Sequence, residues 1–377
     1  MTDPPATPPA RRARRSQGRS PASRREAIRE NVLFWVKAIL VILLLRAFIF
    51  EPYRIPSESM EDTLLVGDFL IVSKLHYGAR TPETIGLPLT QIYVPGLRLP
   101  QTRLPGFSSP QRGDVAVFNY PADRDVVRGA IPDALPAERR APYIKRLVGM
   151  PGDTLAVLDK VLHINGQPQP LGPTMKQRWR VVSPGADRPT ARALEELGVS
   201  YIPGSDVRRA DGTIATPRQY DVVARADQAR ALEARPDVAR VVPFVYPEGA
   251  ELLLDHIGTW NPDQYGPVVV PGRGVTVALD RQTGPLYAET IRRHEGRRVA
   301  ALSDSTFAID GQPAGTYTFA QDYYFAMGDN RDNSVDGRAW GFVPEDHLIG
   351  KAVFNFMSWR SLVPPVPRLE RFFRPIR

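Results

Sequence analysis

Two serines in a short loop-like segment could carry out nucleophilic catalysis. Ser57 and Ser59 stand in Ile-Pro-Ser-Glu-Ser-Met, a few residues beyond a long apolar stretch. A serine hydroxyl becomes an effective nucleophile only when a base takes its proton. Histidine is the usual base, but no histidine of this chain belongs to a motif that supports the role. Lysine is the alternative, because burial in a low-dielectric site lowers the pKa of its ammonium group.

Lys145 is the lysine whose neighbours favour burial. It lies in Tyr-Ile-Lys-Arg-Leu-Val-Gly (143–149), an apolar run typical of a β-strand. Strand alternation would put Tyr143, Lys145 and Leu147 on one face and Ile144 on the other. On this pattern alone, a lysine whose ammonium group reaches water along an apolar surface is the more common outcome. Lys145 is therefore a candidate base that needs further support.

A third segment, Gly-Asp-Asn-Arg-Asp-Asn-Ser-Val-Asp-Gly-Arg (328–338), alternates acidic and basic residues. It partly imitates a calcium loop, but the twelfth loop position, where glutamate is required, is Val343. The pattern instead predicts local ion pairs and turns that hold Ser334 in place. The chain has no cysteine and no H-E-x-x-H motif, which excludes disulfides, thiolate zinc sites and a histidine-based metalloprotease. We expect no metal and no cofactor.

An apolar stretch precedes the serines and could anchor them at a membrane. Residues 32–50 are about long enough to span a bilayer, and Lys37 and Arg46 lie near the two ends of the stretch, where cationic side chains reach the headgroups. A buried core helix and a cleaved signal peptide are the alternatives. A signal peptide has a shorter apolar core and a small-residue cleavage site, whereas Glu-Pro-Tyr-Arg follows here. We expect an uncleaved transmembrane helix at 31–50.

The positive charge of the chain is concentrated at its two ends. The net charge is +8, of which residues 1–30 contribute +5 and residues 360–377 contribute +4, which leaves −1 between them. A nucleic-acid-binding protein carries its charge on a folded surface, so we expect membrane lipid and no nucleic acid as partner. An Arg-rich start could also be an organellar transit peptide. The positive-inside rule otherwise keeps this end cytoplasmic and places the residues after 50 outside.

The remainder of the chain reads as mainly β. Proline accounts for 38 of 377 residues, which disfavours long helices and central strands and favours turns and edge strands. Short strands are predicted at 70–72 and 115–118, and hairpin turns at Asn165-Gly166 and Asp310-Gly311. Short surface helices are predicted at 189–197 and 226–235. Residues 85–110 read as a long apolar loop, and the segment after residue 362 as a basic tail that is disordered or rests on a membrane.

Taken together, these segments resemble the type I signal peptidases (leader peptidases), the serine–lysine enzymes of protein export. The resemblance is carried, in the family's order, by these segments: Ser-x-Ser-Met (57–60), Arg-Gly-Asp-Val (112–115), Tyr-Ile-Lys-Arg-Leu-Val-Gly-Met-Pro-Gly-Asp (143–153), Trp-Asn-Pro-Asp-Gln-Tyr-Gly-Pro (260–267), Gly-Asp-Asn-Arg-Asp-Asn-Ser (328–334), Trp-Gly-Phe-Val-Pro (340–344) and Leu-Ile-Gly-Lys-Ala (348–352). It covers about residues 30–165, 244–300 and 305–360. A β-rich ectodomain of antiparallel sheets is the fold that the resemblance implies.

The resemblance also implies a role for each candidate residue. Ser59 would be the nucleophile and Lys145 the general base. The Ser57 hydroxyl and the Ser59 amide would form the oxyanion hole. The supporting residues would be Ser334, which orients Lys145, and an ion pair of Asp336 with Arg338 or Arg146.

This chain departs from the family pattern at several positions. Glu58 replaces a common glycine between the serines, Glu61-Asp62-Thr63 replaces x-Pro-Thr, and Gly337 replaces a frequent serine. These changes remove no catalytic group, but Glu58 and Asp62 could alter the local backbone or charge. Residues 176–243 match no segment of the family pattern and read as an insertion away from the chemistry.

These inferences define an expected layout and function. The expected segments are a disordered basic cytoplasmic tail (1–30), the transmembrane helix (31–50), the first part of a catalytic β domain (51–165), an inserted β-rich region (166–304), the second part of the catalytic domain (305–360) and a basic C-terminal tail (361–377). The chain would remove signal peptides from exported preproteins at the outer face of the bacterial cytoplasmic membrane. The alternatives are a maturation peptidase dedicated to one partner and a catalytically inactive envelope binding module.

Overall fold

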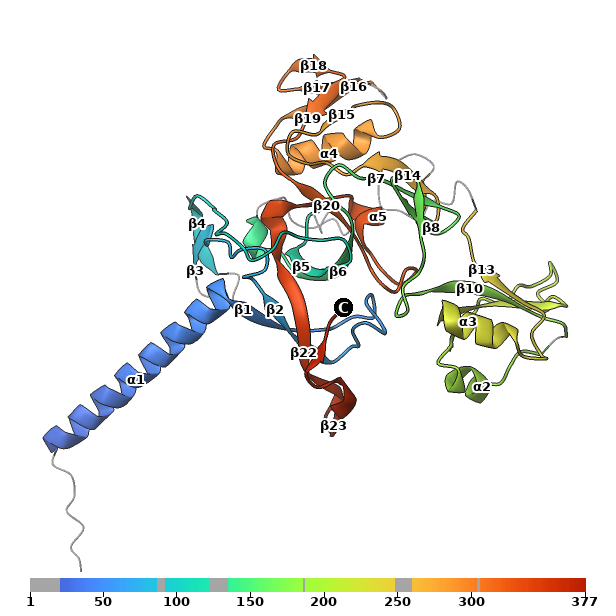
Figure 1. Cartoon of the computed structure of the whole chain (residues 1–377), viewed down its shortest axis with the longest axis horizontal. Helices are drawn as coiled ribbons and strands as arrows, with labels where there is room; N and C mark the ends of the chain where they lie inside the picture. The colour runs from blue at the N-terminus through green and yellow to red at the C-terminus, as the bar shows by residue number, and fades with distance from the viewer. Residues whose placement is uncertain (1–20, 87–91, 123–134, 186, 248–259, 304–305) are drawn as a thin grey trace, which may run out of the picture. The chain divides into compact units, whose positions relative to one another are not determined.

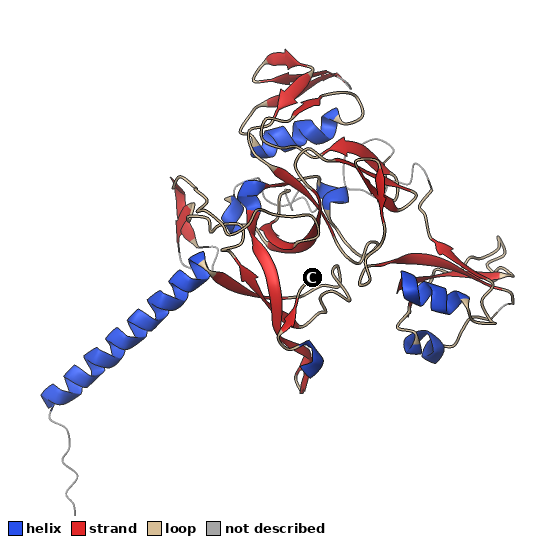
Figure 2. Ribbon diagram, viewed as in Figure 1, coloured by secondary structure: helices blue, strands red, loops and turns tan. Residues whose placement is uncertain are grey.

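The structure is a computed structural model that describes residues 21–86, 92–122, 135–185, 187–247, 260–303 and 306–377. The chain divides into two units, Met1–Arg46 and Ala47–Arg377. Most of the tail expected at 1–30 lies outside the described residues, as do parts of the segments expected at 85–110 and 244–300. Strands dominate the second unit, and its sheets are antiparallel, which confirms the expected fold class (Figure 2).

Helix α1 (Pro21–Phe48) accounts for the described part of the first unit and begins before the expected residue 31. Proline suits the first turn of a helix, where its missing N–H would have no helical partner. Within α1, residues 25–48 are long and apolar enough to cross a membrane, and none of the most apolar window is buried by protein. Trp35, for example, is 63% exposed. The helix is consistent with the expected membrane span.

The main sheet of the second unit brings together segments from both ends of the sequence. Its strand order is β1-β2-β22-β5-β6-β20-β21, and β23 and β24 also pair with β22. The long strand β22, coloured red in Figure 1, thus lies between β2 and β5. The strands of this sheet are β1 (Phe50–Arg54), β2 (Asp68–Ser73), β5 (Val115–Asn119), β6 (Pro142–Gly149), β20 (Tyr323–Met327), β21 (Val343–Pro344), β22 (Leu348–Leu362), β23 (Pro365–Pro367) and β24 (Arg374–Pro375).

The two faces of this sheet pack into separate cores because side chains alternate along each strand. On β6, Tyr143 and Leu147 join one apolar cluster, whereas Ile144 packs against the other. This confirms the predicted alternation. The second cluster also contains Met60 and Leu64 from the loop between β1 and β2, both with no exposed surface. The sheet therefore fixes the chain on either side of Ser59.

A second group of small sheets follows β6 and surrounds its own apolar core. Both predicted hairpins are present, and Asn165 and Asp310 adopt left-handed φ angles of 51° and 50° before their glycines. The helix α4 (Gly284–His294) in this region was not expected. The strands are β7 (Thr154–Leu158), β8 (Val161–Ile164), β9 (Gln167–Gln169), β14 (Tyr265–Val269), β15 (Thr276–Ala278), β16 (Val299–Ser303), β17 (Thr306–Ile309), β18 (Gln312–Ala314) and β19 (Thr316–Thr318).

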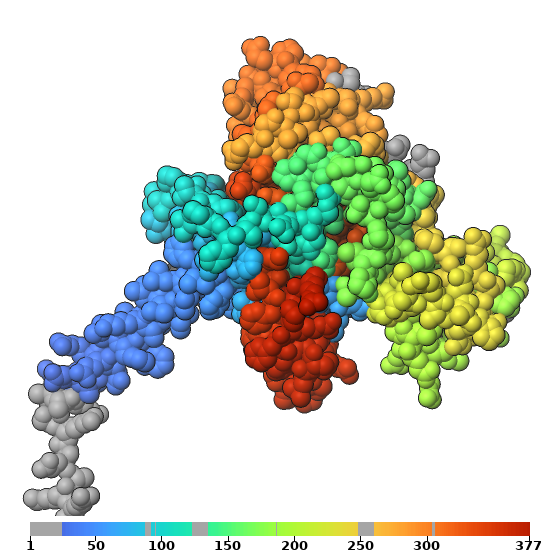
Figure 3. Space-filling model, in the orientation of Figure 1, coloured from blue at the N-terminus to red at the C-terminus, as the bar shows by residue number. Residues whose placement is uncertain are grey.

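The segment 176–243 folds as a small sheet covered by two helices, with a core of its own. It forms the yellow and yellow-green lobe of Figure 3. Both predicted short helices are confirmed as α2 and α3. The elements are β10 (Lys176–Ser183), α2 (Ala191–Glu196), β11 (Ser200–Tyr201), β12 (Arg218–Arg225), α3 (Ala226–Glu233) and β13 (Arg240–Pro243).

Two segments that were expected to be irregular are ordered. Within residues 85–110, β3 (Thr84–Gly86) pairs with β4 (Tyr93–Arg98), so the expected apolar loop contains a short hairpin. The expected C-terminal tail pairs with β22 and contributes Arg371, which is 5% exposed, to the folded unit. The remaining short helices are η1 (Ala137–Arg139), α5 (Gly337–Trp340), η2 (Glu345–His347) and η3 (Leu369–Arg371).

Arg371 explains why the C-terminal segment folds back. Its guanidinium group pairs with the fully buried carboxylate of Asp68 at 2.5–3.2 Å and donates to the carbonyl oxygen of Thr63 at 3.0 Å. We expect Arg371→Met to lower the free energy of unfolding by about 3–5 kcal/mol, because it leaves Asp68 as an unpaired buried charge. Thermal unfolding of the full chain in detergent measures this. Arg374→Met, at an exposed position of the same segment, is the control, and equal melting temperatures for the two variants would contradict the prediction.

Candidate active site

Ser59 and Lys145 meet although they are far apart in sequence. Ser59 is presented by the loop between β1 and β2, and Lys145 comes from β6, where it pairs with Ala116 of β5. Both residues are buried, with exposures of 8% and 3%. Lys145 Nζ donates a hydrogen bond to Ser59 Oγ at 2.5 Å. A nucleophile and a base at this distance are arranged for direct proton transfer.

The surroundings of Lys145 make its amine a better base than that of an exposed lysine. Burial lowers the pKa of Lys145 from its usual value to about 8, although the carboxylates of Asp336 and Asp329 act in the opposite direction. At a pKa near 8, a useful fraction of the protein molecules carries a neutral Lys145 amine around neutral pH. The ring of Tyr143 lies 5.9 Å from Nζ on the same face of the strand. Burial of Lys145 in the sheet core, rather than an adjacent cation, thus supplies the shift.

Ser57 lies next to the pair at the solvent side of the loop. Its hydroxyl oxygen is 3.5 Å from Ser59 Oγ, and its side chain is exposed. The loop is tightened by hydrogen bonds from the Glu61 amide to the Glu58 carbonyl and from the Leu64 amide to the Met60 carbonyl. An exposed hydroxyl beside the buried Ser59 side chain is free to rotate and to donate to another oxygen atom.

The segment 328–338 packs directly against the loop between β1 and β2 that carries Ser59, which we call the serine loop. The Asn330 amide donates to the Ser59 carbonyl oxygen at 3.1 Å. Gly328 permits this approach, because a Cβ atom there would lie 2.2 Å from Ser334 Oγ and 2.6 Å from the Ser59 carbonyl oxygen. Ser334 is therefore at the site, as expected. Ser334 Oγ is shielded from solvent and interacts with the Asp336 carboxylate, and no hydrogen bond from it to Lys145 is seen.

Two buried ion pairs support this segment. Arg338 pairs with Asp336 at 2.9 Å, and Arg338 is one of the two partners that were expected for Asp336. Burial alone would raise the pKa of Asp336, but the Arg338 guanidinium and local hydrogen bonds hold it below its usual value. Arg146 pairs instead with Asp329, at 2.7 and 2.8 Å, so the alternative partner proposed for Asp336 is incorrect.

Asp329 is a site residue whose role the sequence did not reveal. Besides Arg146, its carboxylate accepts a hydrogen bond from Thr63 Oγ1 at 2.5 Å. Asp329 stands within the segment 328–338, in which acidic and basic residues alternate. This pattern indicated that the segment forms ion pairs, but it did not reveal that Asp329 pairs with Arg146. Because the Asp329 carboxylate contacts both the serine loop and β6, it fixes the position of Ser59 relative to Lys145.

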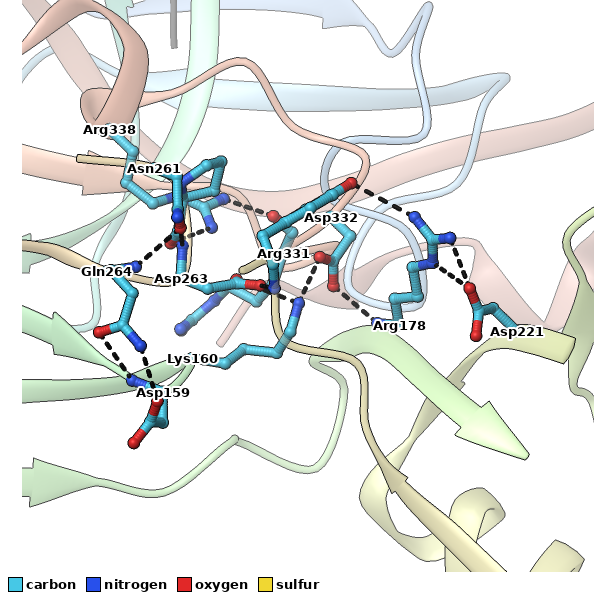
Figure 4. Close-up of polar contacts among 12 residues, drawn as sticks. Asp159, Lys160, Arg178, Asp221, Asn261, Asp263, Gln264, Arg331, Asp332 and Arg338 are labelled. Atoms are coloured by element: carbon cyan, nitrogen blue, oxygen red, sulfur yellow. Dashed lines mark hydrogen bonds and ion pairs between the residues drawn. The ribbon is translucent and has the colours of Figure 1, made fainter. Parts of the chain in front are cut away.

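The motif also contains the predicted ion-pair network (Figure 4). Asp332 pairs with Lys160 at 2.5 Å and accepts from the Arg178 amide at 2.6 Å, and Lys160 also pairs with Asp263 at 3.1 Å. The Arg178 side chain in turn pairs with Asp221. Asp332 thus contacts a protein cation and a backbone amide. The described residues contain no group of acidic or histidine side chains that could hold a metal ion.

The segment 176–243 does not lie away from the chemistry, contrary to expectation. The Lys176 amide donates to the Asp329 carbonyl and the Arg331 amide donates to the Lys176 carbonyl, both at 2.9 Å. Lys176 therefore extends the backbone pairing of the segment that touches Ser59. The sequence around Lys176 contains no recognisable motif, so it gave no indication of this contact.

Comparison with known proteins places the chain in a family. The family model described as "Signal peptidase, peptidase S26" matches residues 28–224 and 270–359, which includes the segments of Ser59, Lys145 and Ser334 and part of 176–243. The chain belongs to this signal peptidase family. It is 28% identical to a signal peptidase I of Buchnera aphidicola, over 85% of this chain and 72% of that protein. It is 27% identical to the signal peptidase I of Haemophilus influenzae, over 90% and 73% of the respective chains.

The low pKa of Lys145 has a consequence for stability that does not depend on any activity. Below pH 8 the folded protein must hold a buried ammonium group, which costs about 3 kcal/mol relative to a pKa of 10.5. We expect Lys145→Met to raise the melting temperature at pH 7. The gain should fade between about pH 8 and pH 10.5, where the wild-type lysine is neutral when folded and protonated when unfolded. Ser59→Ala, which removes only the hydrogen bond, is the control, and destabilisation by Lys145→Met at pH 7 would contradict the expectation.

Proposed function

We propose that this chain is a membrane-anchored endopeptidase that removes N-terminal signal peptides from exported preproteins, with Ser59 as nucleophile and Lys145 as general base. The observation that carries the proposal is the 2.5 Å contact between Lys145 Nζ and Ser59 Oγ in a buried site. Membership of the signal peptidase family supports the reaction and the class of substrate. The buried pair supports catalysis over the alternative of an inactive binding module.

The reaction would proceed by acyl transfer in two steps. Neutral Lys145 takes the proton of Ser59, and the resulting alkoxide attacks the carbonyl carbon of the scissile bond. The Ser57 hydroxyl and the Ser59 amide donate hydrogen bonds to the oxyanion. The protonated Lys145 then donates its proton to the departing amine, and the mature protein leaves. Water, deprotonated by Lys145, hydrolyses the acyl-enzyme and releases the signal peptide.

The supporting residues would keep the pair aligned through the cycle. Asp329 and Asp336 lie near enough to Lys145 to stabilise its charge after proton transfer. Their own charges are balanced by Arg146 and Arg338. Ser334 packs beside the serine loop, where a small movement of Lys145 on protonation would bring the two side chains into contact.

Helix α1 would anchor the enzyme with its Arg-rich end in the cytoplasm and the catalytic unit outside. This arrangement confines enzyme and membrane-tethered preproteins to one surface, which raises their effective concentration. The site would accept small residues before the cleavage point, as the A-x-A pattern of signal peptides requires.

Cleavage of an A-x-A preprotein in detergent tests the proposal. We expect wild type to cut at the predicted bond and both Ser59→Ala and Lys145→Ala to be inactive. Ser57→Ala should lower kcat by about 10²–10³-fold, the usual effect of removing one oxyanion donor. Ser108→Ala, at an exposed serine elsewhere in the fold, is the control. Near-normal activity of Lys145→Ala would refute the base, and cleavage of only one of several unrelated preproteins would favour a dedicated maturation peptidase.

The pH dependence of the rate tests the base separately. Because only neutral Lys145 can accept the proton, kcat/KM should fall about tenfold for each pH unit below the pKa of Lys145, near 8, and level off above it. The rate is measured with one preprotein between pH 6 and pH 9.5 within the stable range of the enzyme. A flat profile across this range would mean that Lys145 is not the group whose deprotonation limits the reaction.

A further inference from the structure

The loop that follows Ser59 is held by two cations from the segment 176–243. Lys176 Nζ lies 3.2 Å from Asp62 Oδ1 and 3.5 Å from Glu61 Oε2. Arg225 Nη1 lies 2.9 Å from Asp62 Oδ2. Both carboxylate oxygens of Asp62 are therefore engaged, each by a different side chain of the same small sheet.

The position of these two cations is unusual for a sheet. Lys176 and Arg225 are direct partners at the end of the antiparallel pair formed by β10 and β12. Like charges directly opposite one another on paired strands repel. Lys176 is also 4% exposed, so water cannot screen its charge effectively. The arrangement needs an anion between the two cations, and Asp62 supplies it.

Asp62 in turn adopts a conformation that needs support. Its φ angle is 72°, in the left-handed region that non-glycine residues rarely occupy. Aspartate tolerates this region better than most residues, but surrounding contacts must hold it there. Asp62 is three residues from the nucleophile in sequence, and Met60 between them is fully buried. The backbone angle at Asp62 therefore affects the path of the chain at Ser59.

Lys176 joins the two segments that form the site. Its backbone pairs with the segment at Asp329 and Arg331, while its ammonium group pairs with the serine loop. Thr174, just before it, contacts Thr63 Oγ1 at 2.7 Å. Arg225 is itself fixed by two hydrogen bonds to Asp227, at 3.0 and 2.9 Å, so it approaches Asp62 from a rigid position.

We propose that Lys176 and Arg225 are positioning residues for Ser59, which they align by clamping Asp62 in its left-handed conformation. The segment 176–243 thereby influences catalysis through the ion pairs that Lys176 and Arg225 form with Asp62. This inference rests on the proposed function of Ser59. It also assigns a role to Asp62, one of the positions at which the chain departs from the usual family pattern.

Kinetics of Arg225→Gln, Asp62→Asn and the double variant test the clamp. Asparagine tolerates the left-handed region, so Asp62→Asn removes only the charge. Each single variant should lower kcat about tenfold, since a small misplacement of a nucleophile is costly, with KM and the pH midpoint of the profile unchanged. The double variant should lose no more than either single variant, because both break the same interaction. Arg225→Lys should restore part of the rate.

The control is Arg230→Gln, at an exposed position of helix α3, which begins directly after Arg225. Active-site titration corrects each rate for the fraction of folded enzyme, so a loss of stability alone leaves the corrected kcat at the wild-type value. Wild-type kcat in Arg225→Gln and Asp62→Asn would overturn the clamp, as would losses that multiply in the double variant.

Hydrogen exchange of the amides in residues 58–64 tests the clamp without any catalytic readout. Arg225→Gln should accelerate exchange there, and Arg230→Gln should not. If wild type proves inactive on preproteins, the proposed function fails while this measurement still decides the clamp. Unchanged exchange in Arg225→Gln would overturn it.

Discussion

The contact between Lys145 and Ser59 sets the constraint on which the rest of the site depends. A lysine with a pKa near 8 has to lie in a low-dielectric environment, yet it must be within hydrogen-bonding distance of a serine that a substrate can reach. The structure meets both demands by placing Lys145 on a central strand, β6, and Ser59 on a loop that closes over that strand. Met60 and Leu64 hold the loop in the core, and the Asn330 amide binds the Ser59 carbonyl, so apolar packing and backbone pairing together fix the position of Ser59.

The charges around the pair are arranged to preserve this low pKa. Asp329 and Asp336 raise the pKa of Lys145, but burial outweighs their effect, and each carboxylate is paired with an arginine, Arg146 for Asp329 and Arg338 for Asp336. The same ion pairs connect the loop, the strand and the segment 328–338 into one frame. A buried ion pair is costly to form, so we interpret these pairs as devices of geometry and electrostatics rather than of stability.

Segments that look peripheral in sequence converge on this frame. Arg371 from the C-terminal segment binds the Thr63 carbonyl, and Lys176 and Arg225 from the region 176–243 bind Asp62. Each supplies a cation to the short loop after Ser59. The loop is therefore held from several directions, as a nucleophile on a loop requires if it is to keep its alignment without regular secondary structure.

Sequence alone was sufficient for the features that depend on local patterns. Proline content and alternation predicted a mainly β unit, Asn-Gly and Asp-Gly predicted both hairpins, and the apolar run predicted the N-terminal helix. The family motifs pointed to Ser59 and Lys145, although sequence gave no measure of the burial of Lys145. Tertiary structure decided the partners, because an ion pair depends on side chains brought together by strand order and not by sequence distance. That Arg146 pairs with Asp329, that Arg371 is buried, and that Lys176 and Arg225 share Asp62 follow from the placement of β22 and of the sheet containing β10 and β12, which no local pattern encodes.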